Sequence, residues 1–154
     1  MSIKSYQSEV YGDGEIIVHE GDDSREMYVI QSGAVVVTRS IDGKTVELAE
    51  LERGNFFGEM SLLESIPRNA TIRAVGETRL LVIKPGELLL KIRRNPTFAL
   101  EMLQQMSLRI RRLNGRIVEL FSDGEITAQT LRDMETIQIA PSQVRSEFSD
   151  PQIP

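Results

Sequence analysis

Short β-rich segments separated by glycine turns fill the first half of the chain, and they limit its fold more than any other feature. They recur roughly every ten residues, and the stretches between them contain Gly-Asp, Ser-Gly, Asp-Gly or Arg-Gly pairs. The strongest is Ala34–Thr38, where valines dominate. Asp42-Gly43 has the composition of a tight hairpin turn. Such a succession of short strands predicts a β-sandwich or a β-barrel.

The expected strands cover residues 15–20, 26–30, 34–38, 45–51, 71–75 and 78–83. Residues 1–13 are expected to form an edge strand or an arm. Ser32-Gly33 is predicted to break the chain between the second and third of these strands. The alternation of Val46, Leu48 and, after Ala49, Leu51 predicts that the fourth strand is half buried.

The pattern changes to helix at Lys84-Pro85-Gly86. A short helix is predicted over Glu87–Arg94, ended by Asn95-Pro96, and a long helix over Thr97–Phe121. Gly115 weakens the long helix by about 1 kcal/mol relative to alanine. Apolar residues at heptad spacing form a seam on this helix, at Ala99, Leu103, Met106, Ile110, Leu113, Ile117 and Leu120. The seam predicts a homodimer, and the alternative is a helix packed on its own β-domain.

The predicted fold is therefore mainly β with a C-terminal α part: a double-stranded β-helix (jelly-roll) followed by a short helix and a long helix. The 154 residues suit one domain. We expect it to cover residues 1–121, with the β-roll at about 12–84 and the helices at about 87–121. Residues 122–154 form a C-terminal extension, and the composition after Pro141 predicts that it is partly disordered.

Composition excludes several classes of function. The chain has no cysteine, so it has no disulfide, thiolate metal site or cysteine nucleophile. Its single histidine, His19, cannot supply a cupin-type metal site or a convincing Ser-His-carboxylate set. We therefore expect no enzyme, no catalytic residue, no metal and no cofactor. The absence of a long apolar run or signal peptide predicts a cytoplasmic protein without a membrane span, and the net charge of −5 weighs against nucleic-acid binding.

Residues 57–71 hold the groups best suited to a ligand. Gly58 allows close approach to the backbone, and a short helix expected from Met60 would present free N–H groups to an anion. The planar, permanently charged fork of Arg68 suits phosphate. Glu59 would repel phosphate but can accept a sugar hydroxyl. Phosphate together with ribose predicts a nucleotide, and the alternative is a structural ion pair between Arg68 and Glu59.

Residues 12–121 resemble the cyclic nucleotide-binding domain, the family of the bacterial catabolite activator and of the regulatory subunits of protein kinase A. The resemblance lies in Gly58-Glu59-Met60-Ser61-Leu62 and Pro67-Arg68-Asn69-Ala70-Thr71, which are similar to the two ends of the family's phosphate-binding cassette. The spacer between them has the length found in the kinase subunits. The glycine turns also fall where the family has them, at Gly14, Gly21, Gly33 and Gly54.

The resemblance implies roles for individual residues. Arg68 would pair with the cyclic phosphate, and Glu59 would accept the ribose 2′-hydroxyl. A residue of the long helix, Leu113 or Asn114, would cap the base. The full ligand-binding set implied is Gly58, Glu59, Met60, Ser61, Arg68, Asn69 and Ala70.

Asn69 departs from the family pattern. The position after the arginine is usually Ala or Ser in cAMP binders and often Thr in cGMP binders of the kinase type. An amide can donate to phosphate or contact a guanine edge. Family frequency places cAMP ahead of cGMP as the ligand.

The predicted function is a sensor that couples cyclic mononucleotide binding to movement of the C-terminal helices, through a hinge near Leu62 and Leu63. One alternative is a degenerate fold that serves as a dimerisation or interaction module without nucleotide; a cupin-like enzyme is the weakest. The expected partners are the nucleotide, a second copy through the long helix and an unknown protein in trans. Residues 122–154 are too few for a helix-turn-helix domain, so no DNA-binding domain is visible, and we expect a stand-alone domain or a piece of a larger protein.

Overall fold

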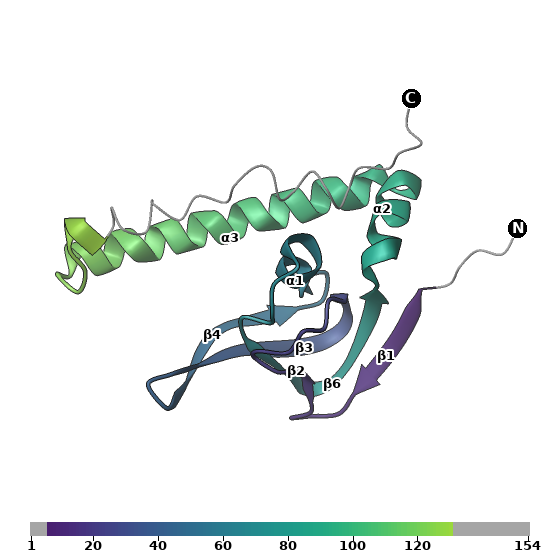
Figure 1. Cartoon of the computed structure of the whole chain (residues 1–154), viewed down its shortest axis with the longest axis horizontal. Coiled ribbons are helices and arrows are strands. Elements are labelled where there is room, and N and C mark those ends of the chain that lie inside the picture. The colour runs from purple at the N-terminus through teal and green to yellow at the C-terminus, as the bar shows by residue number, and fades with distance from the viewer. Residues whose placement is uncertain (1–5, 131–154) are drawn as a thin grey trace, which may run out of the picture. The chain divides into compact units, whose positions relative to one another are not determined.

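The computed structural model describes residues 6–130. They form two compact units that divide between Pro96 and Thr97. The first unit contains the strands and the two shorter helices, and the second contains the long helix (Figure 1). No helix within residues 6–130 combines the length and the apolar character that crossing a lipid bilayer requires.

In the described part of the chain, six strands form one antiparallel sheet. They are β1 (Gln7–Tyr11), β2 (Ile16–Val18), β3 (Met27–Ile41), β4 (Lys44–Glu52), β5 (Phe56–Phe57) and β6 (Thr71–Ile83). The order is β1-β6-β3-β4, with β2 paired to β6 and β5 paired to β3. The two long strands β3 and β6 lie side by side, and each has different further partners at its two ends, so the sheet curves back on itself (Figure 1).

The long strands correct two predicted interruptions. The break expected at Ser32-Gly33 is wrong, because β3 continues through Gly33, with register shifts on either side of Ser32. Gly33 has φ +82°, so the strand bends as a bulge without leaving the sheet. Likewise, residues 71–75 and 78–83 belong to one strand, β6, and Gly76 at φ +67° absorbs the irregularity between them.

The core lies between the curved halves of the sheet. Tyr28 stacks on Phe57 with ring centroids 5.0 Å apart and an interplanar angle of 18°. The buried cluster consists of Val18, Tyr28, Ile30, Val35, Phe57, Ile72, Leu80 and Val82. These residues come from β2, β3, β5 and β6, so the core depends on pairing between strands distant in sequence.

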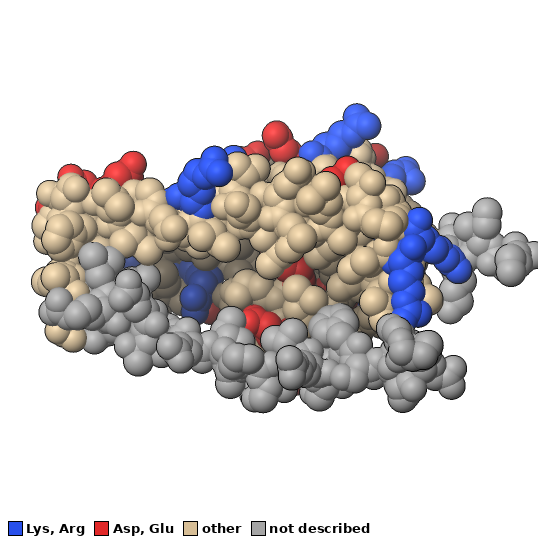
Figure 2. All heavy atoms as spheres, turned by 90° about the horizontal axis from the view of Figure 1, so that it is seen from above, with Lys and Arg blue, Asp and Glu red and all other residues tan. Residues whose placement is uncertain are grey.

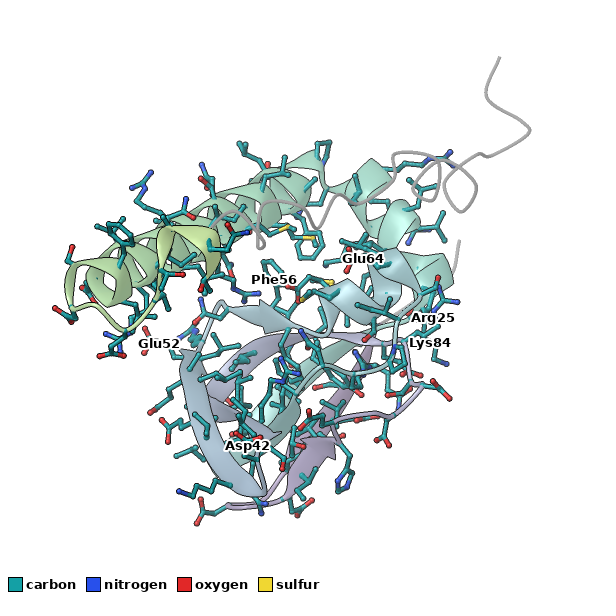
Figure 3. All side chains as sticks on the ribbon, turned by 60° about the vertical axis from the view of Figure 1, so that its left-hand side comes forward. Arg25, Asp42, Glu52, Phe56, Glu64 and Lys84 are labelled. Carbon is teal, nitrogen blue, oxygen red and sulfur yellow. The ribbon has the colours of Figure 1, made fainter. Side chains whose placement is uncertain are left out.

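The hairpin between β3 and β4 has the predicted turn, with Asp42 at φ +51° and Gly43 at φ +75° (Figure 3). The predicted half-burial of β4 is wrong for Val46 and Leu48, which are exposed, whereas Leu51 is partly buried against the core cluster. The strand stands at the end of the sheet order and pairs with β3. Of its apolar residues, only the one near its C-terminal end therefore reaches the core.

Helix α1 (Glu59–Glu64) begins one residue before the predicted start at Met60. Helix α2 (Pro85–Arg94) begins two residues earlier than predicted, because Pro85 occupies its first turn and the Glu87 carboxylate accepts from the Lys84 N–H at 3.1 Å. Helix α3 (Pro96–Ser122) matches the prediction within one residue at each end.

The predicted order of β-roll, short helix and long helix is confirmed. The predicted domain boundary at residue 121 stays a prediction. The predicted disorder after Pro141 lies outside the described residues.

Candidate ligand-binding site

Residues 58–70, here called the cassette segment, connect β5 to β6 and contain α1. Gly58 is the N-cap of α1 with φ +81°, a conformation that favours glycine. A Cβ atom at Gly58 would lie 2.7 Å from the Glu26 carbonyl oxygen and 2.8 Å from Nη1 of Arg68. The glycine thus allows the backbone to meet the loop before β3 and the arginine at the far end of the segment.

Arg68 is the best-anchored side chain of the segment, and only 2% of it is exposed. Its Nε donates to Ser24 Oγ at 3.0 Å, its Nη1 to the Gly58 carbonyl at 3.1 Å, and its Nη2 to the Glu26 carbonyl at 2.7 Å. These bonds use three of the five N–H donors of a guanidinium. All three acceptors are neutral, so they fix the orientation of the group without neutralising its charge.

A carboxylate lies near this guanidinium but not in hydrogen-bond contact with it. Glu26 Oε2 is 3.8 Å from Arg68 Nη2, and the Glu26 side chain is 37% exposed. Burial lowers the pKa of Arg68, while the nearby Tyr28, Glu26, Asp22 and Glu59 oppose that shift. Arg68 is therefore a buried cation with one loose ion pair, which is favourable for an incoming anion.

The loop before β3 is hydrogen-bonded to the C-terminal half of the cassette segment, at Ser65 and Arg68. Gly21 N–H donates to the Arg68 carbonyl at 2.7 Å, and Arg68 N–H donates to the Asp22 carbonyl at 2.8 Å. Arg25 donates to Ser65 Oγ at the C-cap of α1. In Figure 3 Arg25 and Glu64 lie at the same end of the first unit. The loop and the segment thus form one bonded assembly.

The other predicted site residues divide into buried and exposed groups. Glu59 and Ser61 are buried in the first turn of α1, and Ala70 is buried just before β6. Met60 and Asn69 are exposed, and the Asn69 amide nitrogen lies 3.4 Å from the Met60 sulfur. Among the predicted site residues, Gly58 is therefore in contact with Arg68, and Met60 with Asn69.

Leu113 and Asn114 belong to α3, in the second unit, and their role as a base cap stays a prediction. Three residues of the heptad seam of α3 are strongly exposed, Leu103 at 64%, Ile110 at 58% and Leu113 at 64%, and the other four are partly buried. Figure 2 shows Lys and Arg side chains at several separate places on one face of the molecule, with acidic and uncharged residues between them. That face does not present a single basic patch.

Sequence analysis missed Ser24 and Glu26, which orient Arg68. They precede it by 44 and 42 residues: Ser24 lies between two expected strands, and Glu26 is the first residue of the second of them. No local pattern connects two segments that far apart, so only the folded chain could identify these two residues.

Comparison with known proteins agrees with this geometry. The family model of the cyclic nucleotide-binding domain matches residues 8–95. The cyclic AMP receptor protein of Thermus thermophilus is 34% identical over 112 residues, which are 72% of this chain and 52% of that protein. The cAMP-dependent protein kinase regulatory subunit of Mucor circinelloides is 37% identical over 73 residues, covering 47% of this chain and 17% of the subunit.

Among solved structures, the catabolite activator protein of Thermus thermophilus is similar with a TM-score of 0.67 and 34% identity, covering 75% of this chain and 55% of that one. The chain thus spans about half the length of the bacterial receptor and less of the kinase subunit. The resemblance seen in the cassette motif is confirmed over most of the first unit: the chain belongs to the cyclic nucleotide-binding domain family.

Proposed function

We propose that this chain is a regulatory domain that binds a cyclic mononucleotide at the cassette segment. The observation that carries the proposal is Arg68, which is buried, held by three neutral acceptors and only loosely paired with a carboxylate. A cyclic phosphate carries one negative charge and acceptor oxygens, which suits the donors that remain on a guanidinium.

The residues around Arg68 would make the other contacts to the ligand. Glu59 is close enough to Arg68 to influence its pKa, and it would accept the ribose 2′-hydroxyl. Gly58, Met60 and Ser61 would approach the ribose and phosphate from the first turn of α1. Asn69, whose amide lies beside the Met60 sulfur, would donate to the phosphate or contact the base.

We favour cAMP over cGMP as the ligand. The receptor protein and the kinase subunit that this chain resembles are both named for cAMP. Asn69 is the residue that would alter this choice, because its amide can also contact a guanine edge.

Ligand binding would be passed on through the loop before β3 and through α1. Arg68 is hydrogen-bonded to the loop before β3 and to Gly58 at the start of α1. A phosphate that binds Arg68 would therefore favour one arrangement of loop and helix over another. Movement of the C-terminal helices would carry the signal to a protein partner. A regulatory role of this kind requires no catalytic residue.

The test is a calorimetric titration of refolded, ligand-stripped protein with cAMP and then cGMP. We expect one site per chain, with cAMP preferred. Arg68→Ala should weaken binding by at least about tenfold, because a lost charge-assisted hydrogen bond costs roughly 1.5–3 kcal/mol. Arg68→Lys keeps the charge but loses the planar fork, so it tests binding in a variant that disturbs the buried site less.

Arg53→Ala, at an exposed arginine in the turn before β5, is the matched control and should bind like the wild type. Absence of heat with both nucleotides in a folded protein would contradict the proposal. It would favour the alternative in which the fold serves only as an interaction module.

A further inference from the structure

The loop before β3 places a carboxylate beside the cation that the proposed ligand requires. Two oxygens of Glu26 lie near Arg68 Nη2: the main-chain carbonyl oxygen at 2.7 Å and the side-chain Oε2 at 3.8 Å. The first contact is a short hydrogen bond. The second exceeds hydrogen-bond length and acts only through charge.

The carboxylate is not needed to orient Arg68. Three neutral acceptors already hold the guanidinium, and two of them are backbone carbonyls that no side-chain substitution removes. The carboxylate of Glu26, by contrast, reduces the positive potential that an anion meets at Nη2.

Resting on the proposed function, we propose that Glu26 sets the affinity of the site, because its carboxylate competes with the ligand's phosphate for the charge of Arg68. A bound phosphate would bring a second negative group to the same guanidinium. The phosphate and the Glu26 carboxylate would repel each other. This repulsion either weakens binding or moves the Glu26 side chain toward water. The side chain is 37% exposed, so solvent is within its reach.

The experiment compares cAMP binding by wild type, Glu26→Gln and Asp23→Asn in calorimetry at low and at high ionic strength. Glu26→Gln keeps the size and the main-chain carbonyl but removes the charge. Asp23→Asn removes one charge from an exposed residue of the same loop. Circular dichroism and thermal unfolding establish that each variant is folded.

We expect Glu26→Gln to bind cAMP about threefold to tenfold more tightly than wild type at low salt. The gain should shrink at high salt, because mobile ions screen a partly exposed charge. Asp23→Asn should change the affinity by less than about twofold. A purely structural role for Glu26 predicts weaker binding in the variant and no such salt dependence.

Two outcomes would overturn the inference in distinguishable ways. If wild type binds cAMP and Glu26→Gln binds equally or less tightly, the inference fails while the proposed function stands. If neither protein binds a cyclic nucleotide, both fail. Binding seen only in Glu26→Gln would support the inference, since it would show that the carboxylate holds the site below the detectable range.

Discussion

At Gly33 the backbone of β3 meets β6 so closely that a side chain has no room. A Cβ atom there would lie 2.4 Å from the Glu77 carbonyl oxygen and 2.6 Å from Thr78 Oγ1. Thr78 is fully buried and donates to the Ala34 carbonyl at 2.9 Å, which ties the two strands together. Gly33 is therefore required for two reasons: its positive φ, and the lack of room for a side chain.

Gly33→Ala should lower the free energy of unfolding by about 3 kcal/mol, combining left-handed strain with overpacking against backbone. Gly76→Ala is the control. Gly76 also has a positive φ, of +67°, but nothing lies within 4 Å of its Cβ position. That variant should lose only about 1 kcal/mol. Urea unfolding measures both, and equal losses would contradict the steric argument.

The Tyr28 phenol should make the free energy of unfolding decrease at alkaline pH. Burial, assisted by the charges of Glu26 and Glu9 and opposed by Arg68, raises the pKa of Tyr28 above its usual 10.0. The folded protein therefore holds the phenol proton more tightly than the unfolded chain. The stability from this difference is present below about pH 10 and decreases as the pH rises through the folded-state value.

The measurement is urea unfolding of wild type and Tyr28→Phe from pH 7 to pH 11. The unfolding free energy of wild type should fall more steeply above about pH 10 than that of the variant. Parallel curves over this range would show that the tyrosine does not titrate with folding.

Among the elements, α3 has a weak point at Gly115. No positive φ is found there, and nothing lies within 4 Å of its Cβ position. Because alanine is the better helix former, Gly115→Ala should stabilise α3 by roughly 0.5–1 kcal/mol.

Thermal unfolding followed by far-ultraviolet circular dichroism, which reports helix content, measures the effect. Gly86→Ala, in the first turn of α2 with similarly open space, is the control and should change less, since frayed helix ends gain little from propensity. A loss of stability in Gly115→Ala would mean that the glycine is needed for packing.

At the scale of the whole molecule, the homodimer expected from the heptad seam of α3 stays a prediction; Leu103, Ile110 and Leu113 of the seam are exposed. Alternate Leu, Ile and Met residues at heptad spacing bury themselves when two helices pair. Ile110→Glu should shift the protein to monomer in analytical ultracentrifugation, because a carboxylate in a dimer seam is costly.

Leu108→Glu is the matched control, since Leu108 is 46% exposed but lies off the seam. It should leave the assembly state unchanged. A wild type that sediments as a monomer at all concentrations would contradict the dimer.

The sequence by itself determined the local elements. Asp42-Gly43 specifies its turn, Asn95-Pro96 specifies the end of one helix and the start of the next, and the heptad spacing specifies α3. Turn chemistry and periodicity are local properties, so neighbouring residues are enough to read them. The cassette motif likewise marked Gly58 and Arg68 as candidate site residues, whereas the hydrogen bond from Arg68 to the Gly58 carbonyl is seen only in the folded chain.

Only the tertiary structure decided what surrounds these elements. Ser24 and Glu26 reach Arg68 because the sheet brings the loop before β3 to the cassette segment. Gly33 bends a strand instead of ending it because β6 continues beside it, and Val46 stays exposed because β4 stands at the end of the sheet order. Each depends on pairing between residues far apart in the chain, and long-range pairing leaves no periodic trace in a single sequence.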